Sequence, residues 1–471
     1  MKRAFVSSKA ISAIGLISLV VGGCTTIPAD RGLGQVQSLV QSRTTEDIQL
    51  PVVGSELKLS EEEVTKLLAF PLKIRDAERL SLQRNTMLKA KLANVGLAAA
   101  DYAQAGRMEN PGFSLARFSS EDYEATTLFD IGGIVLMPLR RKIAARQLQS
   151  AQYRAAGDVL DHLKNTRDLW IKAVTEIQKT RLMEDVIEAA ETANQLTRQM
   201  TAIGHSSKRE AGESELALAE MRASLSKQRI VETSVREQLI QTLGLWGADA
   251  SLVMLPEKLQ SQPTAPVDYQ QVAEYAVKNR LDVQIATLEL ETMAKNFKLT
   301  RSSPFFSAIE LGAVLESAEG EEERGFEIEF RLPLFDWGGI KTEKARIAFQ
   351  QAEAQAHSTA VAAASMAREA LHAYRRTWDI ANAYTSQVLP IREALDREEL
   401  LRYNGMLISV FDLLKNAQKS LQTEVRHIEA LRDFWLADNQ LRHTLVAAGN
   451  STMQFSSPSS APAGDGDGGG H

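Results

Sequence analysis

The sequence lacks most of the features that mark catalytic and nucleic-acid-binding proteins. Its 471 residues include one cysteine, so no disulfide can form within the chain. The formal net charge is −6 without a basic stripe, which argues against a nucleic-acid partner. Walker loops, His-Glu-x-x-His, Cys-x-x-Cys and Gly-x-Ser-x-Gly motifs are absent. The seven histidines show no pair at ligand spacing, so we predict no enzymatic activity, catalytic residue, metal site or other cofactor.

The N-terminus has the pattern of a secretory signal. Lys2, Arg3 and Lys9 precede an apolar stretch that is too short to span a bilayer, and two glycines precede Cys24. This arrangement resembles a bacterial lipobox, which implies a signal peptide over residues 1–23 and lipid attachment to Cys24. Thr25 follows the cysteine rather than Asp, which implies delivery to the outer membrane. The alternative is an incidental cysteine in an ordinary signal peptide.

Two terminal segments lack the composition of a packed domain. Residues 24–58 are rich in Thr, Gln, Gly, Pro and Ser and are predicted to form an extended tether. Residues 450–471 hold Ser, Pro, Gly and Asp with almost no apolar residues, so we predict a disordered tail. Removal of the three leader cations would leave a mature chain near −9.

Long helices dominate the remainder. Residues 139–200 contain no proline, and their apolar positions step by three and four. About 60 residues at ~1.5 Å per residue give roughly 90 Å, a length typical of a coiled coil. A similar helix is predicted from about Gly339 toward Tyr403, with a kink or break at Pro390.

Two short regions instead predict β-hairpins, at about residues 111–138 and 304–334. In the second, Phe326, Ile328 and Phe330 alternate with Glu327, Glu329 and Arg331 after a loop predicted at residues 320–323. Strict alternation indicates a strand with two different faces. Strands of about ten residues can cross a membrane at a tilt, with the apolar set toward lipid and the charged set lining the lumen.

The order of elements occurs twice. Landmarks recur at an offset of roughly 195 to 200 residues, in the same order each time. The paired landmarks are Pro111 with Pro304, Pro138-Leu139 with Pro333-Leu334, Gly204 with Gly405, and Thr242-Leu243 with Thr444-Leu445. We interpret this as duplication, with a first repeat at 59–250, a linker at 251–267 and a second repeat at 268–449.

These segments together resemble the TolC-type outer membrane efflux family over nearly all of the mature chain. The most specific matches are Asn279-Arg280-Leu281-Asp282, Leu332–Gly339 and Tyr403–Leu414, while Asn110-Pro111 and Gly204–Glu210 match more loosely. The resemblance implies a mainly α fold with a small β part. It also implies a homotrimer in which four strands per chain form a 12-stranded transmembrane barrel, continued by a periplasmic α-helical barrel.

An independent argument also favours three copies. Four strands leave open edges, which a membrane does not tolerate. Eight strands from two copies would nearly fill with side chains, whereas twelve leave a lumen.

The resemblance also implies a gate at the two turns between the long helices. It places Gly204, Glu210, Gly405, Ser409 and Asp412 at the periplasmic aperture. Three copies of one carboxylate form a ring that favours cations. The alternative is an ordinary helix-start acid stabilised by the helix dipole. Lys415 lies where some relatives carry a second acid, which weakens the case for a strong cation ring.

The leading functional hypothesis is a passive outer-membrane exit duct of a tripartite efflux system. Its implied partners are an inner-membrane transporter, most simply of the RND type, a periplasmic adaptor and outer-membrane lipid. Tyr403–Leu414 and Asn110-Pro111 resemble heavy-metal or copper efflux members more than drug-efflux members. Two alternatives stay open: the channel of a type I secretion system, and a structural coiled-coil lipoprotein without a pore.

Overall fold

The computed structural model describes residues 29–44, 49–50, 59–118, 122–302, 309–318, 321–330 and 339–448. The predicted signal peptide, Cys24 and the C-terminal tail lie outside these residues. The chain forms two compact units, and each combines segments of both predicted repeats. Unit 1 comprises Met1–Glu56, Met87–Asp158 and Leu281–Ala360, and unit 2 comprises Leu57–Thr86, Val159–Arg280 and Val361–His471.

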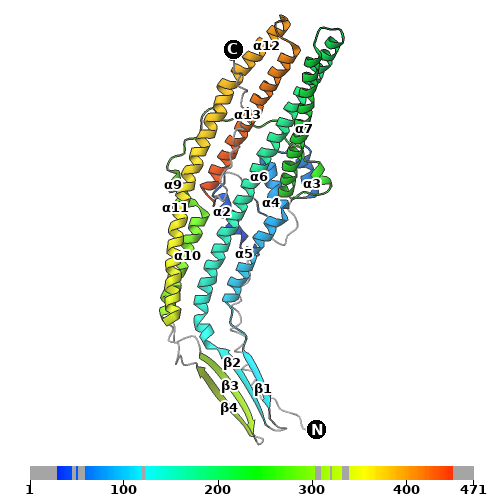
Figure 1. Cartoon of the computed structure of the whole chain (residues 1–471). Coiled ribbons are helices and arrows are strands. Elements are labelled where there is room, and N and C mark those ends of the chain that lie inside the picture. The colour runs from blue at the N-terminus through cyan, green and yellow to red at the C-terminus, as the bar shows by residue number, and fades with distance from the viewer. Residues whose placement is uncertain are drawn as a thin grey trace, which may run out of the picture. The chain divides into compact units, whose positions relative to one another are not determined.

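Unit 1 contains one four-stranded antiparallel sheet with the order β1-β2-β3-β4 (Figure 1). The strands are β1 (Gly112–Arg117), β2 (Tyr123–Asp130), β3 (Ile309–Ala318) and β4 (Glu321–Phe330). The second hairpin therefore follows the prediction closely. Its predicted loop is too long, because Glu321, Glu322 and Glu323 belong to β4 and Ala318 pairs directly with Glu321.

The first hairpin is shorter than the predicted 111–138. Strand β2 ends at Asp130, and helix α6 (Ile131–Ala202) begins at the next residue with Pro138 inside it. Residues 131–139 carry two overlapping patterns. Ile131, Val135 and Leu139 recur at four-residue steps, which suits a helix, whereas the alternation read from the sequence is interrupted at Gly133. Among the described residues, the pairing of β2 with β3 ends at Asp130 opposite Glu310, and the helical pattern begins there.

The predicted tether is not extended throughout. Residues Leu33–Gln41 form helix α2, which buries Val36 and Val40 completely. Its apolar residues recur at three- and four-residue steps, so one face packs while Arg43 donates a hydrogen bond to Gln284. The other helices with residues in unit 1 are α5 (Thr86–Ala105), α10 (Leu281–Ser302) and the first parts of α6 and α11 (Gly339–Ala383).

Two long helical hairpins belong to unit 2. Helix α6, 72 residues long, turns into α7 (Lys208–Leu243), and α12 (Leu389–Asn404) turns into α13 (Val410–Thr444). The break predicted at Pro390 is present, because α11 and α12 are separated by a π-helical turn, Tyr384–Val388. Proline lacks a backbone N–H and crowds the preceding turn, so the wider π turn accommodates it. No helix in the described part of the chain is long and apolar enough to span a bilayer.

The core of unit 2 gathers leucines and valines from α3 (Glu61–Leu68), α4 (Ile74–Arg84), α6, α7 and the linker. The linker lies between α8 (Ala248–Ser251) and α9 (Val272–Asn279) and is fixed by aromatic side chains. Trp435 Nε1 donates to the Gln260 carbonyl at 2.8 Å, Trp378 Nε1 donates to the Pro263 carbonyl at 2.9 Å, and the Val267 N–H donates to the Tyr374 hydroxyl at 3.0 Å. These two tryptophans therefore hold the linker in place.

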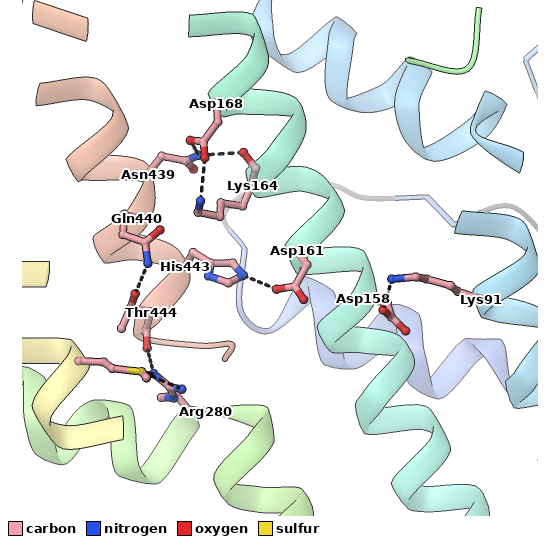
Figure 2. A network of polar contacts seen from close by, with 11 residues as sticks. Lys91, Asp158, Asp161, Lys164, Asp168, Arg280, Asn439, Gln440, His443 and Thr444 are labelled. Carbon is pink, nitrogen blue, oxygen red and sulfur yellow. Dashed lines mark hydrogen bonds and ion pairs between the residues drawn. The ribbon is translucent and has the colours of Figure 1, made fainter. Parts of the chain in front are cut away.

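Buried polar groups fasten the end of α13 (Figure 2). His443 Nε2 lies 2.6 Å from Asp161 Oδ1 of α6, and Asn439 donates to Asp168 at 2.7 Å. Arg280, only 1 % exposed, donates to the Thr444 carbonyl at 3.3 Å. The buried guanidinium of Arg280 is tolerated because it has hydrogen-bond partners. Its bond to Thr444 helps to hold the end of α13 in place.

Candidate functional site: the strand faces and the helical turns

The sheet separates acidic from apolar residues by face. Directly paired residues of an antiparallel ladder lie on the same face. One row across three strands joins Glu124, Glu316 and Glu323. A second row joins the register positions of Asp130, Glu310 and Glu329. The same face also holds the positions of Glu321 and Glu327, so eight of the nine acidic residues of the four strands share it.

The opposite face is apolar. Phe326 pairs with Ala313, Ile328 with Leu311, and Phe330 with Ile309. Several of these side chains project from the sheet without cover, with Phe113 71 % and Phe326 80 % exposed. The predicted alternation is thus present in the register: Glu327 is exposed on the acidic face, and Glu329 occupies a position of that face. Arg331 lies outside the described residues.

The edges of this sheet are strands β1 and β4. Each carries ladder partners on one side, as given by the pairs β1–β2 and β3–β4. A membrane offers no water to backbone groups, so an edge there needs another strand. The described sheet therefore has one apolar face, one acidic face and two edge strands.

The two helical turns have the same backbone hydrogen bonds, displaced by 202 residues. In the first turn, the N–H groups of Gly204 and His205 donate to the carbonyls of Thr201 and Met200. In the second turn, Met406 and Leu407 donate to Tyr403 and Arg402. Both are Schellman endings, in which the residue after the cap adopts a left-handed conformation.

The left-handed residue differs between the turns. It is Gly204 (φ 82°) in the first and Met406 (φ 59°) in the second, while Gly405 has φ −81°. The predicted pairing of Gly204 with Gly405 is therefore off by one residue. The sequence favours Gly405 because glycine is the usual residue at a left-handed position, where any other residue is strained.

A capping box follows each turn. Ser207 Oγ accepts the Glu210 N–H at 3.1 Å, and Glu210 Oε2 accepts the Ser207 N–H at 2.9 Å. Ser409 and Asp412 make the same pair of bonds at 3.2 and 3.0 Å. These reciprocal bonds satisfy N–H groups at the helix start that have no helical partner.

Hydrogen bonding also stabilises the ionised form of both carboxylates. The Ser207 backbone N–H, then the Ser206 hydroxyl, lowers the pKa of Glu210. The Ser409 hydroxyl, then its backbone N–H, lowers the pKa of Asp412, and Lys415 adds to the effect. The Asp412 charge acts on Glu210 in the opposite direction, raising its pKa. Both acids have a structural role in the caps, and their predicted role at an aperture stays a prediction.

Apolar side chains are exposed at these turns. Ile203 is 70 % exposed, Leu407 is 76 % exposed and Met406 is 93 % exposed. The sequence did not single out Met406, because nothing in the pattern distinguishes a left-handed methionine from a helical one. In the described part of the chain, no group of three or more His, Cys, Asp or Glu is placed to hold a metal ion.

Comparison with known proteins rests on structure. No family model and no curated protein matches the sequence. Three similar solved structures are a membrane protein from Pseudomonas aeruginosa, the Campylobacter jejuni CmeC outer membrane channel and the open Neisseria gonorrhoeae MtrE outer membrane channel. They share 15, 13 and 15 % identity, with TM-scores of 0.67, 0.66 and 0.63. The matches cover 84, 79 and 85 % of this chain and 98, 85 and 97 % of those chains.

This chain has the outer-membrane channel fold. The resemblance to TolC-type proteins seen in the residues is confirmed at the level of the fold. The heavy-metal branch, lipid attachment at Cys24 and the oligomeric state stay predictions.

Proposed function

We propose that this protein is the outer-membrane channel of a tripartite efflux system, a passive duct supplied by an inner-membrane pump and a periplasmic adaptor. The observation that carries the proposal is the four-stranded sheet with one apolar face, one acidic face and an edge strand on each side. This sheet suits a membrane only when its edges pair with other copies. Three copies give twelve strands with room for water inside.

The acidic face supports a lumen that favours cations. Within the four strands, the residues on that face include eight acids and no Lys or Arg. Closing the sheet with this face inward surrounds the lumen with negative charge, and the apolar face meets lipid. Rings of carboxylates attract cations and repel anions. Heavy-metal cations are therefore compatible cargo, and drugs are the other class that the proposal admits.

The fold neighbours support the channel assignment, since CmeC and MtrE are described as outer membrane channels. Lipid attachment at Cys24, an outer-membrane location with the helices in the periplasm, and an RND-type pump as the partner belong to the same proposal. The type I secretion alternative shares the fold, and cargo assays would separate it.

The test is single-channel recording with purified protein in planar lipid bilayers, accompanied by gels of unheated and heated samples. We expect a heat-modifiable trimer and discrete conductance steps that favour K⁺ over Cl⁻. A monomer that leaves the bilayer impermeable would overturn the proposal and favour a structural lipoprotein. The gate is tested separately: Asp412→Ala should raise conductance or weaken cation preference, and unchanged values would remove Asp412 from the aperture.

A further inference from the structure

The four helices of unit 1 follow the order of the strands. Helix α5 leads into β1, α6 follows β2, α10 leads into β3, and α11 follows β4. Contacts within the chain join the helices in that same order. These contacts are the ion pairs Lys91–Asp158 and Arg154–Glu289, each at 2.6 Å, and the stacked rings of Phe297 and Phe349, with centroids 6.5 Å apart. Helices α5 and α11 therefore extend the two edge strands of the sheet.

The exposed surface differs between the inner helices and the edge helices. Over residues 139–158 of α6 and 281–297 of α10, every exposed residue is Arg, Lys, Gln, Thr or Glu. The edge helices instead expose large apolar side chains. Met87 and Leu97 of α5 are 70 and 65 % exposed, and Ile340 and Ile347 of α11 are 83 and 53 % exposed. Uncovered apolar surface is thus concentrated on the helices that continue the open edges.

The exposed apolar residues of the edge helices recur at coiled-coil spacing. Ile340, Ile347 and Ala354 follow one another at seven-residue steps on α11, and Met87, Ala90 and Leu97 are separated by three and seven residues on α5. Such steps place side chains on one face of a helix, where they can pack against a second helix.

The two apolar faces also lie at similar positions along their helices. Leu97 lies eight residues before Ala105, the last residue of α5, and Ile347 lies eight residues after Gly339, the first residue of α11. Eight residues correspond to about 12 Å along a helix axis. Because α5 runs toward the sheet and α11 runs away from it, the two helices have opposite directions.

We propose that α11 of one copy packs against α5 of the next copy through these two apolar faces, as an antiparallel pair of helices. The inference rests on the proposed function, in which β4 of one copy pairs with β1 of the next and brings the adjoining helices together. A lipid or a separate protein would have no reason to bind only the helices at the two edges, whereas a second copy meets both. The contact between copies then continues from the sheet along the helices and removes the apolar faces from water.

The test is a charge swap across the proposed contact in full-length protein purified in detergent. Analytical ultracentrifugation at decreasing protein concentration measures the fraction of trimer. L97K and I347E each place an unpaired charge in an apolar contact, so each should weaken the association of copies at least about tenfold. The double variant L97K/I347E puts opposite charges on the two faces and should restore most of the trimer.

The matched controls Q147K on α6 and T287E on α10 add the same charges at exposed positions of the inner helices and should leave the trimer fraction unchanged. Stable trimers of both single variants would overturn the inference and leave lipid or a separate protein as the occupant of these faces. A double variant that associates no better than either single variant would overturn it as well. Either result with conducting trimers of the unaltered protein refutes only the helix contact, whereas unaltered protein without trimers or conductance refutes the channel.

Discussion

The two helical hairpins share a backbone and differ in how their helices are held together. The α6–α7 pair carries three inter-helical ion pairs, Glu184–Arg229, Glu191–Arg222 and Arg198–Glu215, at 2.7 to 2.8 Å. They recur every seven residues on both helices, which is the repeat of a coiled coil. Among the described residues, no ion pair joins α12 to α13.

The second hairpin relies on hydrogen bonds around one carboxylate instead. Asp396 of α12 accepts from Asn416 and Ser420 of α13, each at 2.8 Å. The helix leading into this hairpin is interrupted by the π turn at Tyr384–Val388, and its turn holds a strained Met406. The comparison teaches that the duplicated turn preserves its caps while the two hairpins join their helices through different polar contacts.

The largest expected effect concerns the residue that joins the hairpins. Leu414 is the only α13 member of a buried cluster formed otherwise by α6 and α7. Leu414→Ala should cost about 2–4 kcal/mol through lost burial and a residual cavity. Hydrogen exchange should show lost protection mainly in α12–α13. Leu218→Ala, the matched change in α7, should instead lower hydrogen-exchange protection mainly in α6–α7. Loss of protection in the same helices for both variants would contradict the comparison.

The two capping boxes should contribute equally to stability. Ser207→Ala and Ser409→Ala each remove a capping hydroxyl, and each should lower stability by about 1 kcal/mol. Thermal unfolding in detergent measures both. A loss at one turn and none at the other would break the similarity that the hydrogen bonds indicate.

Substitutions at the two left-handed positions should change stability in opposite directions. Met406→Gly should stabilise the second turn by roughly 0.5–1 kcal/mol, because relief of left-handed strain exceeds the added chain entropy. Gly204→Met should destabilise the first turn by a similar amount. A Cβ added at Gly204 meets no atom within 4 Å, so the expected cost comes from the left-handed backbone and not from crowding of the Cβ. Stabilisation by Gly204→Met, read from the same unfolding curves, would refute this account.

Acid should weaken both turns. The pKa of Glu210 and that of Asp412 are lowered in the folded protein, so their contribution is fully present above the ordinary carboxyl pKa near 4. It is lost as the pH falls through the lowered values. Unfolding temperatures from pH 6 to pH 3 should therefore fall less steeply for Glu210→Gln/Asp412→Asn. Parallel slopes in variant and unaltered protein would contradict the capping role.

The smallest effect belongs to the ion-pair ladder. Its six side chains are 42–63 % exposed, and exposed pairs contribute about 0–1 kcal/mol each. Glu191→Gln should lower α6–α7 stability by at most a few tenths of a kcal/mol at low salt, and by less at 1 M salt. An effect that is larger at high salt would exclude an electrostatic origin.

The sequence predicted those features that a few neighbouring residues determine and that no competing pattern obscures. The uninterrupted 3–4 pattern predicted α6, Pro390 predicted a break, and period-two alternation predicted β4. The end of β2 was not predicted because residues 131–139 suit both the two-residue period of a strand and the longer period of a helix. Only the pairing of β2 with β3 shows where the strand ends. Helix α2 was missed because nine residues in a polar segment form a helix chiefly through packing. Nothing in the sequence marks Met406 as left-handed. In contrast, the seven-residue spacing of Glu184, Glu191 and Arg198 could have predicted the row of ion pairs between α6 and α7.

The most direct test of the account is whether the edges of the sheet meet between copies. Ser114→Cys on β1 and Gly325→Cys on β4 place cysteines at the acidic-face positions of both edges. After oxidation of intact outer membranes, a non-reducing gel of the double variant should show dimer and trimer bands and nothing larger. Each single variant, which also retains Cys24, should show neither a trimer nor a larger band. Monomers alone, or an open-ended ladder beyond three copies, would contradict a closed barrel of three chains.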